Sequence, residues 1–134
     1  MNDTSTTPAY LLLFRNTAWH RDLSPEEIQH TMSQWSQWFN RLVDQGKCKG
    51  GHPLGGEGQV ITGKARSVSD GPFAEAKEAV AGYFYLEVDT IEEALEIGRE
   101  CPALDHGMTV EVRPVLANCV QSELAKRALT PVEV

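Results

Sequence analysis

The spacing of apolar residues predicts a long amphipathic helix in the first half of the chain. Between residues 24 and 46 apolar side chains recur at steps of three or four, which places them on one helix face. They are Ile28, Met32, Trp35, Phe39 and Leu42. Ser24 and Glu27 form a Ser-x-x-Glu capping box, and Pro25 suits the first helical position. Gly46 suits the position just past the helix end.

Two shorter helices are expected later in the sequence. Asp89 or Thr90 can cap the first of them, and Pro102 ends it. Its expected buried stripe consists of Ile91, Ala94, Leu95 and Gly98. The second is a short C-terminal helix between residues 118 and 129.

Runs of apolar and β-branched residues predict four core strands and one hairpin. The expected core strands are Ala9–Phe14, Lys47–His52, Gly82–Val88 and Thr109–Arg113. The first is apolar throughout, which predicts burial on both of its faces. Gln59–Thr62 and Ala65–Val68 flank Gly63-Lys64, a two-residue connection that favours a β-hairpin.

The resulting order, β-α-β, hairpin, β-α-β, predicts an α+β fold of the ferredoxin-like split βαβ type with an extra hairpin. Both helices then cover one face of a four-stranded sheet. The strand containing Tyr83, Phe84, Tyr85 and Leu86 carries bulky groups on both faces. We therefore expect a second copy of the chain to cover the other face, giving a homodimer. Residues 1–8 are expected to be a flexible tail, residues 9–116 the domain and residues 117–134 an extension.

Composition narrows the function classes. A formal net charge of −7 argues against a nucleic-acid binder that relies on a broad basic surface. The longest apolar run has the length of a strand, far short of the roughly 20 residues that span a membrane. The N-terminus lacks the pattern of a signal peptide, which favours a cytoplasmic location. The three cysteines form no Cys-x-x-Cys pair.

One stretch carries a family resemblance. Residues 70–78, Asp-Gly-Pro-Phe-Ala-Glu-Ala-Lys-Glu, are followed by Gly82-Tyr-Phe-Tyr-Leu86, by a Glu-Glu-Ala-Leu helix and by Val110-Glu-Val-Arg-Pro114. This succession resembles the DGPF branch of the YCII-related family, and the likeness extends from about Tyr10 to Val115. Most members of the family are uncharacterised bacterial proteins.

The resemblance implies a dimeric α+β barrel in which two ferredoxin-like sheets face each other and enclose small cavities. Related chains include an enzyme that removes chloride from a chlorinated hydroxyquinol, and DGPF-type domains often accompany sigma-factor genes. In the founding YCII branch, a His on the first helix and an Asp after the second strand are proposed as a catalytic pair. Here Trp35 falls near that His position, and the helix histidine, His30, lies more than a turn away. Asp70 is the best match for the Asp.

Asp70 has two readings that are both compatible with its sequence context. A carboxylate at the mouth of an apolar cavity can act as a general acid or base. Asp before Gly-Pro is also a common turn former and can cap a helix. His20 and His52 are expected near one sheet edge and are the candidate catalytic partners of Asp70. The histidines show no metal-ligand spacing such as His-x-x-x-His, and no cofactor motif is present, so neither a metal nor a cofactor is predicted.

The substrate-binding candidates are Lys77, Trp19 and Tyr83. Lys77 can pair with an anionic group or belong to a solvated face. Trp19 and Tyr83 can form a pocket for a flat ring. Trp35 is better explained by core packing, and Trp38, at the edge of the helix stripe, is a candidate for the dimer contact.

Two functional hypotheses follow. The first is a homodimer with a small-molecule cavity that acts as an acid/base enzyme of lyase type on a small polar or phenolic compound. The second is a non-catalytic ligand-binding or regulatory module that works with a transcription factor such as a sigma factor. A ligand-sized cavity lined by Asp70 and a histidine would favour the first, and a filled dimer interface would favour the second.

Overall fold

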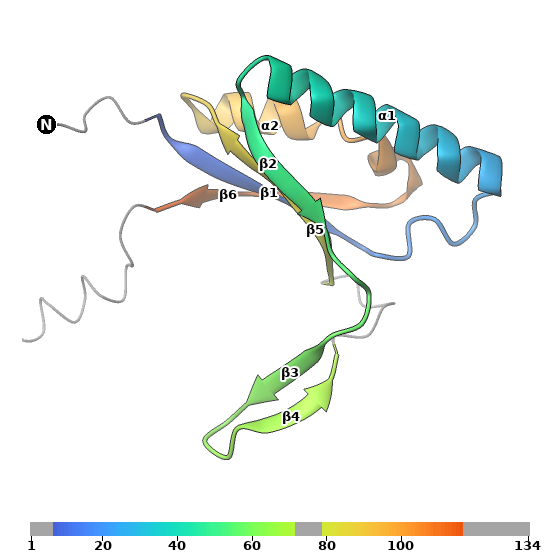
Figure 1. The fold of residues 1–134 in the computed structure, drawn as a ribbon, viewed down its shortest axis with the longest axis vertical. Helices are drawn as coiled ribbons and strands as arrows, with labels where there is room; N and C mark the ends of the chain where they lie inside the picture. Colours follow the sequence, from blue (N-terminus) through green and yellow to red (C-terminus); the bar gives the residue numbers. More distant parts are fainter. Residues whose placement is uncertain (1–6, 72–78, 117–134) are drawn as a thin grey trace, which may run out of the picture.

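The computed structural model describes residues 7–71 and 79–116. Two helices lie on one face of a four-stranded antiparallel sheet, and a separate two-stranded hairpin projects from one end of it (Figure 1). The sheet strands are β1 (Ala9–Arg15), β2 (Cys48–Pro53), β5 (Val80–Glu87) and β6 (Thr109–Val115). The other elements are α1 (Pro25–Asp44), β3 (Gln59–Thr62), β4 (Ser67–Asp70), α2 (Ile91–Gly98) and the 3-10 helix η2 (Pro102–His106).

The strand order of the sheet is β2-β5-β1-β6. Strand β5 therefore lies between β1 and β2, and β1 lies between β5 and β6, with α1 and α2 as the two crossovers. This confirms a mixed α+β chain with an antiparallel sheet and two helices, compatible with the ferredoxin-like plan. The expected helix between residues 118 and 129 and most of the expected N-terminal tail lie outside the described residues.

Both ends of α1 follow from its sequence as expected. The Ser24 hydroxyl accepts the Glu27 backbone N–H at 3.1 Å, and the Glu27 carboxylate accepts the Ser24 backbone N–H at 2.8 Å. The hydrogen bond from the Ser24 backbone N–H is the largest cause that lowers the pKa of the Glu27 carboxyl, and the Ser24 side chain acts in the same direction. The helix ends at Asp44, with Gln45 as its C-cap and Gly46 following at φ 74°.

The buried face of α1 differs from the expected stripe. Thr31, Trp38 and Leu42 are buried, whereas Met32 is 46% exposed. The difference arises because α1 packs against η2 and the end of α2 as well as against the sheet. Trp38, only 3% exposed, donates its indole N–H to the Glu100 carboxylate at 2.9 Å. The expectation that Trp38 serves a dimer contact is therefore wrong.

Helix α2 is capped by Thr90, whose hydroxyl accepts the Glu93 backbone N–H at 3.1 Å. Its buried face consists of Ala94, Ile97 and Gly98. Ile91 and Leu95 were expected in this stripe but are 38% and 40% exposed. Ile97, one turn after Ala94, takes their place, so the buried face of the helix is rotated from the expected one.

The two faces of the sheet differ in burial. On the helix face, Leu12 pairs with Phe84 across β1 and β5, and both side chains are buried. On the other face, here called the open face, Leu11 lies opposite Tyr85 and Leu13 opposite Tyr83, and all four are half-buried. Within the protomer, β1 is thus buried on one face only, which corrects the expectation of burial on both.

Ion pairs border the apolar centre of the open face. Arg15 Nε donates to Glu111 Oε1 at 2.8 Å, and Arg113 Nε lies 3.7 Å from the other oxygen of that carboxylate. Toward the β2 edge of the same face, Lys49 Nζ of β2 lies 4.0 Å from the Glu87 carboxylate of β5. The leucine–tyrosine centre is therefore framed by charged groups that are already paired.

The β3–β4 hairpin forms, but with another connection than expected. Thr62 pairs with Ser67, so the loop has the four residues 63–66 rather than two. Gly63 at φ 78° and Arg66 at φ 55° close it, and the Arg66 N–H donates to the Gly63 carbonyl at 3.0 Å. Ala65 and Arg66 thus belong to the loop, because the positive φ at Arg66 ends the turn two residues later than a two-residue connection would.

Candidate functional site

A cavity of about 440 Å³ lies between α1 and the adjoining ends of β2 and β5. Six of its lining residues are aromatic: Phe14, Trp19, Trp35, Phe39, Tyr83 and Phe84. A volume of this size falls within the range of small-molecule sites, which are commonly lined by apolar and aromatic groups with a few polar ones.

The rings of the cavity wall hold one another in place. Phe14 meets Trp35 edge to face with centroids 4.9 Å apart, and Phe39 lies 5.0 Å from Phe84. Trp19 lies 6.4 Å from Trp35, measured between ring centroids. Such contacts fix ring orientations through many small attractive terms. The wall is therefore rigid on the side formed by the core.

Trp19 reaches the cavity from the loop after β1. Asn16 adopts φ 77° there, and its amide donates to the Gly107 carbonyl at 2.8 Å while its side-chain oxygen accepts the Ala18 N–H at 3.3 Å. The Trp19 ring stacks on His106 at a centroid distance of 6.3 Å. The loop is thereby tied to the segment that follows η2, which determines where Trp19 lies.

Two glycines on the paired strands leave the cavity floor without side chains. A Cβ at Gly51 would overlap the Tyr83 carbonyl oxygen and lie 2.8 Å from a Phe84 ring carbon. A Cβ at Gly82 would lie 2.9 Å from the His52 carbonyl oxygen. Because the clashing oxygens belong to the backbone, neither strand can yield without disturbing the sheet. Glycine is required at both positions.

His52 and Tyr83 border the cavity at its strand edge, and because they alternate with Gly51 and Phe84 their side chains lie on the open face, where His52 is exposed. They are direct partners across β2 and β5, and His52 Nδ1 lies 2.8 Å from the Tyr83 hydroxyl oxygen. If the hydroxyl donates, the imidazole carries its proton on Nε2. If Nδ1 donates, Nε2 is a free acceptor and the Tyr83 hydroxyl can donate to another molecule. The pair can thus offer both a proton acceptor and a proton donor to one ligand.

Three of the six residues selected from sequence come together in this cavity: Trp19, His52 and Tyr83. His20 is exposed beside it, with its ring 5.6 Å from that of Trp19, and does not line it. Asp70 is the last residue of β4, is exposed and accepts a long hydrogen bond of 3.4 Å from the Gln59 amide. Lys77 lies outside the described residues.

The remaining wall residues were missed as site residues. Trp35 and Phe39 follow the helical spacing of a core stripe, so their pattern cannot separate packing from cavity lining. Both are half-buried and pack against the core while also facing the cavity. Gly51 and Gly82 carried a usable signal, since glycine inside a strand indicates a close approach of backbone or ligand.

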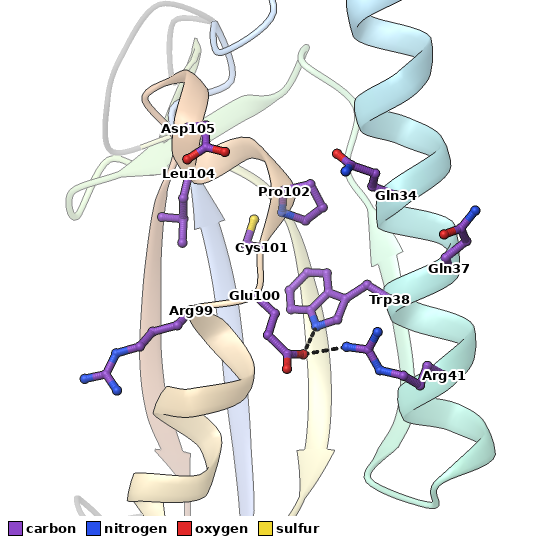
Figure 2. Close-up of a pocket in the computed structure, with 10 residues that line it drawn as sticks. All are labelled: Gln34, Gln37, Trp38, Arg41, Arg99, Glu100, Cys101, Pro102, Leu104 and Asp105. Atoms are coloured by element: carbon purple, nitrogen blue, oxygen red, sulfur yellow. Dashed lines mark hydrogen bonds and ion pairs between the residues drawn. The ribbon is translucent and has the colours of Figure 1, made fainter.

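A second concavity, about 620 Å³ in volume, lies between α1 and the segment joining α2 to η2. Figure 2 shows Trp38 and Arg41 of α1 both reaching the Glu100 carboxylate, at 2.9 and 2.7 Å, while Arg99 points away from them. Arg99 pairs with Glu96 of its own helix. Arg41, Arg99 and Glu100 of this groove are thus already paired, which makes it a less promising site than the aromatic cavity.

Comparison with known families complements the geometry. The model of the YCII-related domain matches residues 10–117, which is most of the chain. The protein belongs to the YCII-related domain family. No curated protein matches this YCII-related chain at a significant level.

The described part of this YCII-related protein holds neither a cluster of metal-ligating side chains nor a helix that could span a membrane. Within residues 7–71 and 79–116, no group of three or more His, Cys, Asp or Glu side chains is placed to hold a metal ion. Among the same residues, no helix combines the length and the apolar character needed to cross a membrane.

Cys101 of this YCII-related protein gives a testable pH dependence. Burial raises the pKa of its thiol to about 11, with backbone hydrogen bonds acting in the opposite direction. An unfolded thiol ionises near about 8.5, so the folded state gains stability from this group below that pH and loses it as pH rises through about 11.

We therefore expect the free energy of unfolding to fall between pH 9 and pH 11, and to fall by about 1–2 kcal/mol less in Cys101→Ala. Urea titrations of both proteins across this pH range measure the difference, because tyrosine and lysine titrations cancel in the comparison. Parallel pH curves for the two proteins would contradict the assignment.

Proposed function

We propose that this YCII-related protein, a member of the DGPF branch, is a homodimer that binds a small molecule in the aromatic cavity and acts on it by acid/base chemistry of the lyase type. The substrate class is a small polar or phenolic compound. The observation that carries the proposal is the hydrogen-bonded pair of His52 and Tyr83 at a cavity walled by aromatic rings.

The open face supports the dimer. Its centre consists of Leu11, Leu13, Tyr83 and Tyr85, bulky groups that remain half-buried in the protomer. Apolar groups framed by paired charges are typical of the centre of a protein interface. A second sheet packed here buries these groups and, because Tyr83 and His52 are neighbours on this face, also shields their hydrogen-bonded pair from water.

The proposed chemistry assigns one role to each member of the pair. Nε2 of His52 accepts a proton from the ligand, and the Tyr83 hydroxyl hydrogen-bonds the oxygen on which charge develops. Shielding by a second subunit strengthens both interactions, since electrostatic forces increase as water is excluded. The Trp19 and Trp35 rings orient the ligand against the pair by packing on its apolar part.

A thermal-shift screen tests this proposal, with phenols and small organic acids as probes. Binding stabilises the native state by about 2.7 kcal/mol at a ligand concentration one hundred times Kd, so a binder raises Tm by several degrees. We expect His52→Ala to reduce the shift by more than half. His30→Ala is the matched control, because His30 is an exposed histidine of α1 outside the cavity lining. Equal shifts in both variants would contradict the site.

Turnover separates the enzyme from the competing hypothesis of a non-catalytic regulatory module. For a ligand found in the screen, we expect its consumption to fall about 100-fold or more in His52→Ala and Tyr83→Phe. Asp70→Asn tests the proposal from sequence that Asp70 takes part, since this residue does not line the described cavity. Binding without consumption by the unmodified protein would favour the regulatory module.

A further inference from the structure

We infer that the cavity selects an uncharged, flat aromatic compound that carries a hydrogen-bonding group, and that it discriminates against both carboxylates and organic cations. This inference rests on the proposed small-molecule site and goes further by assigning the charge and shape of the ligand. It derives from the chemistry of the side chains that line the cavity.

Charge is absent from the described lining. Among the lining residues that the structure describes, none is Asp, Glu, Lys or Arg, and the single titratable base is His52. Moving a charged group out of water costs several kcal/mol unless an opposite charge or several hydrogen bonds replace the water. A carboxylate would find His52 alone, and a cation would find no carboxylate. Neutral ligands avoid this cost.

The shape of the lining favours a flat ring. Trp19 and Trp35 approach from the loop and from α1, and Phe39 lies further along the same helix. On the sheet side, Gly51 and Gly82 present backbone without side chains. A planar ligand can therefore lie against the strands with its edges toward the aromatic rings, an arrangement that aromatic groups prefer.

Polar groups lie on two sides of the cavity. Ser36 and Asn40 are one turn apart on α1 and so share a helix face, while His52 and Tyr83 lie on the strands at the edge of the cavity, with their side chains on the open face. A hydroxyl or carbonyl on the ring can bond to either side without bringing charge into the cavity. Met32 and Met108 also line the cavity, and their flexible thioethers adapt to ring substituents.

Isothermal titration calorimetry at pH 7 with four naphthalene probes tests the inference: 2-naphthol, naphthalene, 2-naphthoate and 2-naphthyltrimethylammonium. They share one ring system and differ in charge and hydrogen bonding. We expect 2-naphthol to bind at least 10-fold more tightly than the carboxylate and the ammonium compound. In His52→Ala its advantage over naphthalene should shrink, because only the hydroxyl uses the polar pair.

A blocking variant shows whether binding occurs in this cavity. Ser36 is exposed on α1 and lines the cavity, so Ser36→Phe places a ring in it without disturbing the core. Ser33→Phe is the matched control, an exposed serine of the same helix outside the lining. We expect Ser36→Phe to weaken 2-naphthol binding at least 10-fold and Ser33→Phe to leave it unchanged.

The failures of the two proposals are distinguishable. Tightest binding by the naphthoate or the ammonium probe, still blocked in Ser36→Phe, would overturn the inference and leave the small-molecule site standing. Carboxylate binding that is lost in Lys77→Ala would overturn it in the same way, by showing that a charge from outside the described lining takes part. If none of the four probes binds, the inference is overturned, and the thermal-shift screen then tests separately whether the cavity binds a small molecule.

Discussion

If the open face forms the proposed homodimer, replacing Leu13 by Asp should raise its dissociation constant at least about 100-fold. Leu13 lies opposite Tyr83 at the centre of the open face. In a two-fold symmetric interface one substitution appears twice, so two carboxylates would have to be buried without partners. Analytical ultracentrifugation across a concentration series measures the change. The variant should sediment as a protomer at concentrations where the unmodified chain is a dimer.

Leu95→Asp is the matched control for this experiment. Leu95 is also a partly exposed leucine, at 40%, but it lies on α2, on the other side of the sheet. Its replacement should leave the association unchanged. A stable protomer of the unmodified chain at micromolar concentration would contradict the dimer, and so would equal weakening by the two substitutions.

Replacing Leu12 by Ala should lower the free energy of unfolding by about 2–5 kcal/mol. Leu12 is fully buried between the sheet and the helices and pairs with Phe84. Removing its side chain costs the transfer free energy of the lost carbons and leaves a cavity that close-packed neighbours fill only in part. Urea denaturation at fixed protein concentration measures the loss.

Leu13→Ala is the natural comparison, because it removes the same atoms from the adjacent, half-buried position on the open face. For an isolated protomer its effect on unfolding should be well under half of that at Leu12. Under conditions that maintain the proposed dimer the gap should narrow, since a second subunit on the open face would cover Leu13. Equal losses in the isolated protomer would contradict the assignment of the two sheet faces.

Local signals in the sequence account for much of the fold. The capping box at Ser24 and Glu27, the glycine at 46 and the alternation in the strands act over a few residues, so they can be recognised without tertiary information. Within the described residues, they led to the correct order of the two α-helices and six strands. The predicted length of the hairpin loop was too short by two residues. Its turn depends on a positive φ at Arg66, and arginine rarely adopts a positive φ.

The buried faces of the helices were predicted less well, since they depend on which other elements pack against each helix. The apolar spacing in α1 pointed to Met32, but packing against η2 and the end of α2 turns Thr31 and Trp38 inward instead. Trp38 lies at the edge of the apolar stripe in the sequence, and it was therefore predicted to contact a second subunit. A single sequence contains the period of an amphipathic helix but not the position of a second packing partner.

The residues of the candidate site were likewise predicted only in part. Trp19, His52 and Tyr83 were selected because their chemistry suits a binding site, and the fold brings all three to one cavity. Trp35 and Phe39 could not be distinguished from core residues, because a cavity wall beside a core has the same periodicity as the core itself. Asp70 was selected from a motif, and motif membership gives no distance to the cavity.

The most direct test of the central claim, that the cavity beside His52 and Tyr83 is the functional site, is an NMR titration with 2-naphthol. The side-chain resonances of Trp19, Trp35 and His52 should shift together with a single binding curve, and those of Trp38 and Arg41 in the polar groove should stay in place. Shifts confined to Trp38 and Arg41, or an unchanged His52 at saturation, would contradict it.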